Sequence, residues 1–540
     1  MGSLKHYFSN ILFFILILNM QLLHAQAKRK DIGKLVFERS CFDVLHYDIE
    51  VKIKPKEKFI SGSNNIEFKM LENTSKIQLD YAKSMNLDSA KYMGESIPFN
   101  RKGNTVMFDF SKGLLKNYTY SLKLYFSGKP LEAKLAPWDG GFVWRKDKKE
   151  YDWVGLACEG LGASAWLPCK DHWSDEAEGA DITLIVPKDL TGVSNGKLID
   201  EKIVDSAFKA FHWRVVNPIN NYNISINVGR YVNFKDTFSG INKLPLSYYV
   251  LDYNQAAAEK HFLQVHGMLE AFEHYFGQYP FKEDSYKLVE TPYWGMEHQS
   301  CIAYGNNYKN NDFGFDFIII HESGHEWYAN NITASDAADM WIHESFTTYS
   351  EALYLEYKTN KTSSIEYLLG QKKKIVSKHP MQGPRGVFYH GRTDSDIYYK
   401  GTWMLHTMRS VLNNDSLWFA CLKQMNQKYF HKIVGTEEII QYFNSKTAYN
   451  WNLFFKQYLY SKNIPELEVK QLLLDNGNIR YTLTLEADVK DLNIPLNIKL
   501  PNGQTIAVVL SDKSVVLELD NRFDIYAFIE ANYLLRIEHE

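Results

Sequence analysis

The residues with the clearest capacity for chemistry are two histidines and a glutamate close together in the sequence. Residues 321–325 read His-Glu-Ser-Gly-His. On a helix, positions four apart differ by about 40° in direction, so His321 and His325 would share one face. Two imidazoles at that spacing can bind one zinc ion, and Glu322 beside them can reach a water on the metal. The preceding residues 317–320 are apolar, as a buried site requires.

A catalytic zinc site usually has a third protein ligand and one open position. Eighteen residues separate His325 from Glu344, which lies among apolar neighbours in the next predicted helix. A carboxylate that is buried there needs a partner. His343 is the competing ligand, but on a helix it points about 100° away from Glu344. The residues alone therefore favour Glu344 and leave His343 open.

The elements that must carry these residues follow from the hydrophobic period along the chain. From about residue 34 to 232, apolar residues alternate with polar ones, as at Ile49, Val51 and Ile53, which indicates half-buried antiparallel strands. From about 256 to 460 the period becomes 3.6 and predicts helices. These helices are expected at 256–276, 315–331, 340–357, 398–412 and 451–460. Alternation returns from about 465, with a hairpin turn at residues 501–503.

Composition excludes several classes of protein. The 540 residues are 45% hydrophobic and 23% charged, which excludes a disordered chain and a collagen-like fibre. A net charge of −3 gives no basic excess, so we expect no nucleic-acid partner. Five cysteines are too few for a disulfide scaffold, and we expect most to be buried thiols. Cys158 and Cys169 are the pair to examine for a disulfide.

The first residues are typical of a secretory signal peptide. Lys5 and His6 precede an apolar run from Ile11 to Leu18, and Ala25 and Ala27 follow. The run is short for a membrane span and is followed by Asn19 and Gln21. We therefore expect cleavage of a signal at 1–27, export of the mature chain, and no stable membrane insertion after cleavage; an uncleaved anchor is the alternative.

At its chemical residues the sequence resembles the gluzincin zinc aminopeptidases, the family typified by aminopeptidase N and leukotriene hydrolase. That family's pattern is His-Glu-x-x-His, eighteen residues and Glu, and Trp327 and Asn330 continue its extended motif. Residues 294–298, Trp-Gly-Met-Glu-His, resemble its Gly-x-Met-Glu-Asn exopeptidase loop. Residues 398–401, Tyr-Tyr-Lys-Gly, resemble its Tyr-x-Lys-Gly motif.

A shorter local match lies in the first β domain. Glu159 stands nine residues before Pro168, where the family places another amine-binding side chain. The resemblance covers nearly all of residues 34–460. The hydrophobic periods predict an α+β multidomain protein with an N-terminal β-sheet domain at 34–232, a mainly helical domain at 233–462 and a small C-terminal β domain at 463–540. The resemblance implies that the helical domain is a thermolysin-like zinc peptidase domain.

The resemblance also implies a role for each matched residue. His321, His325 and Glu344 would hold one zinc ion per chain, and Glu322 would be the general base and then the general acid for a zinc-activated water. Tyr398 would stabilise the oxyanion of the tetrahedral intermediate. Tyr399 is its rival, and the register of the Tyr-x-Lys-Gly motif selects Tyr398.

Glu297 and Glu159 would hold the free α-ammonium of the substrate, while Gly295 and Met296 would line the cleft. An internal peptide nitrogen carries no charge and would leave both carboxylates unpaired. The resemblance therefore implies a zinc aminopeptidase that acts on peptides with a free N-terminus. The alternatives are a zinc-dependent epoxide hydrolase, an inactive peptide-binding homologue and a thermolysin-type endopeptidase, which Glu297 disfavours.

Three positions depart from the family pattern. Trp294 replaces the usual Gly of the exopeptidase loop, and His298 replaces its usual Asn. Ser345 stands where the family often has Gly. The first two flank the amine-binding Glu297, so the shape of the first substrate pocket is expected to differ from that of the family.

Overall fold

The structure is a computed structural model, and it describes residues 34–387, 394–500 and 503–539. The chain divides into two compact units, which are described in turn. Of the described residues, unit 1 holds 34–270, 278–330 and 385–387, and unit 2 holds 271–277, 331–384, 394–500 and 503–539. The predicted signal peptide lies outside the described residues.

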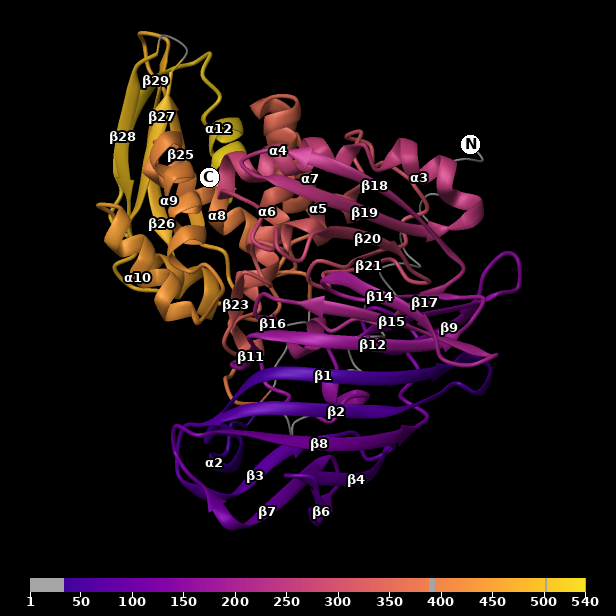
Figure 1. Ribbon diagram of the computed structural model, residues 1–540. Coiled ribbons are helices and arrows are strands. Elements are labelled where there is room, and N and C mark those ends of the chain that lie inside the picture. Colours follow the sequence, from indigo (N-terminus) through magenta and orange to yellow (C-terminus); the bar gives the residue numbers. More distant parts are fainter. Residues whose placement is uncertain (1–33, 388–393, 501–502, 540) are drawn as a thin grey trace. The chain divides into compact units, whose positions relative to one another are not determined.

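An eight-stranded sheet is the largest element of unit 1 (Figure 1). In spatial order its strands are β14 (Lys197–Ile203), β15 (Phe208–Val215), β12 (Gly179–Pro187), β1 (Phe42–Lys54), β2 (Phe59–Met70), β8 (Thr119–Gly128), β4 (Asn86–Tyr92) and β5 (Glu95–Ser96). Ile49, Val51 and Ile53 on β1 are fully buried, which confirms the alternation. The neighbours are antiparallel except β1 and β12, which run parallel; the sequence predicted antiparallel strands.

Smaller sheets complete the first part of unit 1. They comprise β13 (Thr191–Val193), β17 (Asn227–Gly229), β10 (Asp152–Ala157) and β9 (Gly141–Lys146); β3 (Thr74–Asp80), β7 (Thr105–Leu114) and β6 (Phe99–Lys102); and β11 (Glu176–Ala177) with β16 (Ile219–Asn220). A short helix, α2 (Phe37–Ser40), precedes β1. Strand β10 ends directly before Cys158 and Glu159, so it carries the loop of one predicted amine-binding residue.

A five-stranded mixed sheet follows in unit 1. Its order is β18 (Tyr231–Ser239), β19 (Lys243–Leu251), β20 (Tyr286–Glu290), β22 (Ile302–Tyr304) and β21 (Gly295–Met296). The period of 3.6 gave no indication of its last three strands. These strands are short and buried along their whole length, so they show no alternation. Strand β21 carries two of the predicted substrate-binding residues.

The helices after β19 differ in part from the prediction. The expected helix 256–276 is two helices, α3 (Gln255–His261) and α4 (Gln264–Phe276). The expected helix 315–331 is α5 (Phe317–Gly324), which ends much earlier. It ends at Gly324, and glycine is a poor helix former.

Unit 2 contains the following helices, of which the sequence analysis expected only the first, the third and the last. They are α6 (Trp341–Lys358), α7 (Lys361–Lys372), α8 (Tyr399–Leu412), α9 (Asp415–Lys428), α10 (Thr436–Lys446) and α11 (Asn452–Phe455), followed by a π-helical turn at Lys456–Tyr460. Helices α6 and α8 lie within one residue of their predicted bounds. Two short strands, β23 (Ile332–Ala334) and β24 (Lys432–Val434), pair in parallel.

The end of the chain forms the predicted β structure. One sheet has the order β29 (Val515–Asp520), β26 (Asn478–Glu486), β25 (Glu466–Leu473) and β30 (Arg536–His539), and β27 (Ile494–Lys499) pairs with β28 (Thr505–Leu510). Helix α12 (Ile525–Asn532) lies between β29 and β30 in the chain. The predicted hairpin joins β27 and β28, but its residues 501–502 lie outside the described residues.

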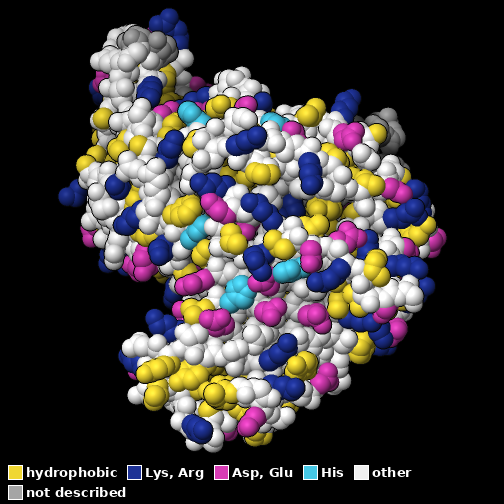
Figure 2. Space-filling model, viewed as in Figure 1, with side chains coloured by type: hydrophobic (Ala, Val, Ile, Leu, Met, Phe, Trp, Pro, Cys, Tyr) yellow, Lys and Arg dark blue, Asp and Glu magenta, His cyan; other side chains and the backbone are white. Residues whose placement is uncertain are grey.

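The surface and the cysteines agree with the composition. Figure 2 shows Lys and Arg side chains interspersed with Asp and Glu over the face in view, as a net charge of −3 suggests. All five cysteines, Cys158 and Cys169 among them, are buried thiols, which confirms that expectation. Among the described residues, no helix is both long enough and apolar enough to cross a membrane.

A buried histidine on α8 leads to a prediction about stability in acid. Burial lowers the pKa of His406 from 6.5 to about 3, and its Nε2 donates a hydrogen bond to the Ala531 carbonyl at 3.1 Å. The unfolded chain therefore takes up this proton at higher pH than the folded chain. The free energy of unfolding should fall by about 1.4 kcal/mol per pH unit for this group as the pH drops below about 6.5.

We expect His406→Gln to make the pH dependence of stability shallower by one proton between pH 6 and 4.5. Urea unfolding at a series of pH values measures the slope in both proteins. Equal slopes in the variant and the parent would contradict the assignment.

Candidate active site

The helix that carries the histidines begins at a buried aspartate. Asp316 Oδ1 accepts hydrogen bonds from the backbone N–H groups of Ile318 at 2.9 Å and Ile319 at 3.4 Å, which caps α5. Its Oδ2 accepts from the Tyr304 hydroxyl and from His261 Nε2, each at 2.7 Å. The carboxylate is thus well paired although it is fully buried, and it sets the residue at which α5 begins.

Two imidazoles lie on one face at the end of this helix. The ring centroids of His321 and His325 are 4.9 Å apart at an interplanar angle of 87°. His325 follows the last residue of α5 but keeps helical dihedral angles, so the early end of the helix does not separate the pair. Its Nδ1 donates to the Tyr328 carbonyl at 3.0 Å, which leaves the Nε2 lone pair available for a metal.

A carboxylate completes a set of possible metal ligands. His321, His325 and Glu344 are all buried and form a group that could hold a metal ion. Two imidazoles and one carboxylate are a donor set that fits Zn²⁺ with one position left open. His343, the competing residue, accepts a hydrogen bond through Nε2 from the Ala334 N–H at 2.8 Å. The structure thus brings Glu344 into the group and uses His343 in the packing of α6.

The start of α8 places a tyrosine beside this carboxylate. The Tyr398 hydroxyl donates to Glu344 Oε1 at 3.0 Å, whereas Tyr399 is the first residue of α8 itself. The glycine of the same motif allows α8 to approach α6 closely. A Cβ on Gly401 would lie 1.8 Å from Ser345 Oγ, so a larger residue there would force the two helices apart.

The predicted amine-binding loop lies against α5. Glu297, Glu322 and His325 form a second group whose ligand atoms lie within 4.8 Å of one another. Gly295 on β21 leaves little space next to the predicted base, since a Cβ there would be 2.7 Å from Glu322 Oε1. Met296 beside it is 3% exposed. The structure therefore brings together the predicted base, one imidazole and the first amine-binding carboxylate.

The second amine-binding carboxylate lies near the first. Burial raises the pKa of the Tyr222 phenol well above its usual value, and the negative charges of Glu297 and Glu159 raise it further. Both carboxylates therefore lie close to the same buried hydroxyl. Glu159 itself is also buried, with 6% of its surface exposed.

Two residues after the histidines hold the amine-binding loop, and the sequence analysis gave them no such role. Glu326 accepts hydrogen bonds from the Ser300 N–H at 2.8 Å and from the Tyr279 hydroxyl at 3.0 Å. Asn330 Nδ2 donates to the Glu297 carbonyl at 2.9 Å. Burial raises the pKa of Glu326 to about 8. The available signal was an acidic residue between His325 and Trp327, directly after the predicted buried site, because a buried carboxylate must find donors.

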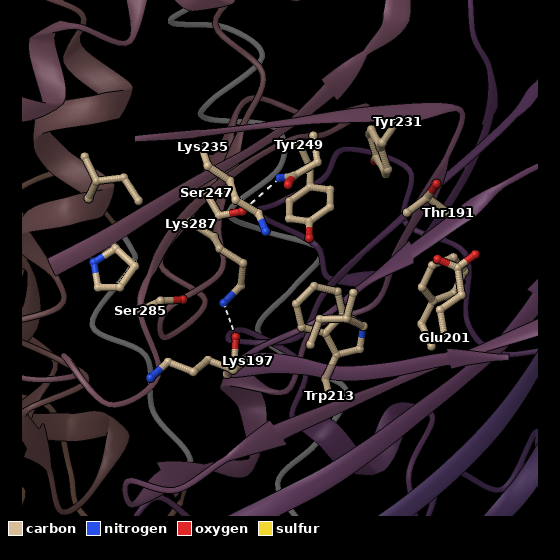
Figure 3. A pocket seen from close by; sticks show the side chains of 16 residues that line it. Thr191, Lys197, Glu201, Trp213, Tyr231, Lys235, Ser247, Tyr249, Ser285 and Lys287 are labelled. Carbon is tan, nitrogen blue, oxygen red and sulfur yellow. Dashed lines mark hydrogen bonds between the residues drawn. The ribbon is translucent and has the colours of Figure 1, made fainter. Parts of the chain in front are cut away.

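A cavity of about 500 Å³ elsewhere in unit 1 contains none of the predicted site residues (Figure 3). In Figure 3 the buried Lys287 reaches the Gly196 carbonyl, marked by a dashed line. The Gly196 N–H in turn donates to Ser300 Oγ at 2.9 Å. The wall of this cavity therefore supports the loop that follows Glu297.

Comparisons with known proteins identify the family of this chain. Residues 44–222 match the model of the Peptidase M1 N-terminal domain, and residues 262–458 match the model of the Peptidase family M1 domain. Aminopeptidase 2 of Candida albicans is 22% identical over 522 residues, which are 89% of this chain and 54% of the relative. Glutamyl aminopeptidase of Rattus norvegicus is 23% identical over 334 residues, which are 57% of this chain and 34% of the relative. The chain spans about half the length, or less, of such relatives.

Solved structures show the same fold. The crystal structure of M1 zinc metallopeptidase from Deinococcus radiodurans aligns with a TM-score of 0.69 at 19% identity, over 80% of this chain and 98% of that one. A mutant of that enzyme bound to a Tyr-Ser-Ala substrate aligns with a TM-score of 0.68 at 18% identity and the same coverage. With both family models matched in order and the fold shared, this chain belongs to peptidase family M1.

Proposed function

We propose that this protein is a zinc aminopeptidase that removes N-terminal residues from peptides. The observation that carries the proposal is the position of Glu297, whose carboxylate lies within 4.8 Å of ligand atoms of Glu322 and His325. A hydrolytic site needs the base and the metal ligands, but it does not need this additional buried carboxylate. The names of the relatives, which are aminopeptidases, also support the proposal.

His321, His325 and Glu344 would hold the zinc ion. When bound, Zn²⁺ supplies Lewis-acid chemistry, which polarises a carbonyl and makes water acidic enough to attack at neutral pH. Glu322 accepts the proton of the attacking water on a carboxylate oxygen and passes it to the leaving amine. Burial of Glu322, which is 8% exposed, keeps this proton away from bulk water.

The two remaining carboxylates select the chain terminus. Glu297 and Glu159 pair with the α-ammonium of the substrate, and both are too buried to be solvated fully. An internal amide brings no positive charge, so its binding would leave two desolvated carboxylates without a cation. This penalty favours removal of terminal residues over internal cleavage.

The Tyr398 hydroxyl is the proposed donor to the carbonyl oxygen that becomes negative during the reaction. Its hydrogen bond to Glu344, one of the proposed metal ligands, supports this role. A donor aimed at a developing oxyanion typically contributes 10²- to 10³-fold to the rate, by order of magnitude.

We also propose that the protein is exported. Support for export comes from residues 1–27 alone, where a basic start, an apolar run and small residues follow one another. This part of the proposal is independent of the catalytic assignment.

The proposed function predicts a strict requirement for a free amine. Peptides and aminoacyl amides with a free N-terminus should be cleaved, and their N-acetylated forms should not. Glu297→Gln should lower kcat/KM for free-amine substrates by about 10- to 100-fold, because one charge-assisted contact is lost. The exposed Glu270→Gln on α4 is the control. Equal cleavage of blocked and free substrates would contradict amine recognition, and lipid-epoxide turnover without peptide cleavage would favour the alternative hydrolase.

The role of Glu322 predicts a separation of metal binding from turnover. Glu322→Gln keeps the size and polarity of the side chain but cannot accept the proton, so we expect kcat to fall by about 10²- to 10⁴-fold. Metal analysis should still find one zinc ion per chain in this variant. Removal of zinc by a chelator should inactivate the parent protein, and zinc should restore it. Full activity of Glu322→Gln would show that another group acts as the base.

A further inference from the structure

Two exposed tryptophans stand next to the candidate active site, and the proposed mechanism does not use them. Trp294 is 42% exposed and Trp138 is 41% exposed, unusual values for such large apolar side chains. Their ring centroids are 6.1 Å apart at an angle of 47°. Trp294 is also the position at which the exopeptidase loop departs from the family pattern.

A series of ring contacts connects this pair to a metal ligand. Trp294 stacks on Phe317 with a centroid distance of 5.5 Å and an angle of 27°. Phe317 stacks on His321 at 5.1 Å and 24°. Trp294 Nε1 also donates to Asn306 Oδ1 at 3.1 Å, which holds the orientation of the indole. The exposed rings are therefore held at a defined position relative to the imidazole.

The order of residues 294–297, which include β21, gives the direction in which a substrate would run. Glu297, the amine-binding carboxylate, lies at one end of this segment. Gly295 lies in its middle, where a Cβ would be 2.7 Å from Glu322 Oε1. Trp294 comes next, on the side away from Glu297. Suppose that the amine of a peptide binds Glu297 and that its first peptide bond lies at the base, Glu322. The second residue of the peptide then lies beyond the base, towards Trp294.

The second tryptophan, Trp138, lies near the second predicted amine-binding carboxylate, Glu159. The backbone of Trp138 lies against Gly160, since a Cβ on that glycine would be 3.4 Å from the Trp138 carbonyl oxygen. Gly160 directly follows Glu159. Trp294 thus shares the loop of Glu297, while Trp138, in the segment before β9, lies against the loop of Glu159, and the two indoles are in contact.

We propose that Trp138 and Trp294 form a subsite for the second residue of the substrate and select peptides with a large apolar or aromatic side chain there. The subsite rests on the proposed aminopeptidase function. Two indole faces at this separation can cover one aromatic ring, which removes apolar surface of both partners from water. A methyl side chain at the second position would cover little of them.

The test is a series of tripeptides in which only the second residue changes, from Ala to Leu to Phe, with a constant first residue. We expect kcat/KM to be about tenfold higher for Phe than for Ala in the parent protein. This ratio should fall to near one in Trp294→Gly and in Trp138→Ala, while Trp294→Phe should keep most of it. Tyr118→Ala, which removes an exposed aromatic side chain elsewhere in unit 1, should keep the full ratio.

Binding to the Glu322→Gln variant gives a readout that does not need turnover. Calorimetry with the same tripeptides should give the lowest Kd for Phe and the highest for Ala at the second position. Adding Trp294→Gly to this variant should remove the difference. If no tripeptide is cleaved, the proposed function is wrong, and the Kd series alone decides on the subsite. An unchanged ratio in both tryptophan variants would overturn the inference. The inference would also be overturned if the tryptophan variants changed the preference for the first residue of the substrate and not for the second.

Discussion

The geometry of the site depends on one buried charge, the carboxylate of Asp316. Helix α5 has eight residues, fewer than an isolated helix needs to be stable in water. Asp316 stabilises the first turn by accepting hydrogen bonds from two backbone N–H groups, and Tyr304 and His261 donate hydrogen bonds to the same carboxylate. Because His321 and His325 follow within about two and a half turns of Asp316, the place where the helix starts also sets the direction of both imidazoles.

A second constraint is the excess of negative charge around the helix. Glu297 and Glu322 lie within 4.8 Å of each other at the level of their carboxylate oxygens, and both are buried. Two carboxylates at such a distance repel each other unless a cation lies between or beside them. The metal ion and the substrate ammonium of the proposed function would both reduce this repulsion. The proposed aminopeptidase reaction uses both of these cations, so it is consistent with the electrostatics of the fold.

The sequence predicted the parts of this structure that have a clear period or a close motif. Alternation correctly indicated strands such as β1, and the period of 3.6 placed α6 and α8 within one residue. The motifs identified the residues that lie together at α5 and β21 in unit 1, and the contact of Tyr398 with Glu344 in unit 2. The buried strands β20, β21 and β22 were missed because they do not alternate. Asp316, Glu326 and Tyr222 act through tertiary contacts, which a local pattern cannot contain.

The parallel pairing of β1 with β12 has a consequence for how the chain reaches this structure. The two strands lie side by side in the centre of the large sheet, yet more than a hundred residues separate them in the sequence. During synthesis, one edge of β1 stays unpaired until β12 has been made, and an unpaired edge can form incorrect pairs with other strands. Closure of this sheet is therefore a late, long-range event, and the loop with Glu159 precedes β12 in the chain, so it is already made when the sheet closes.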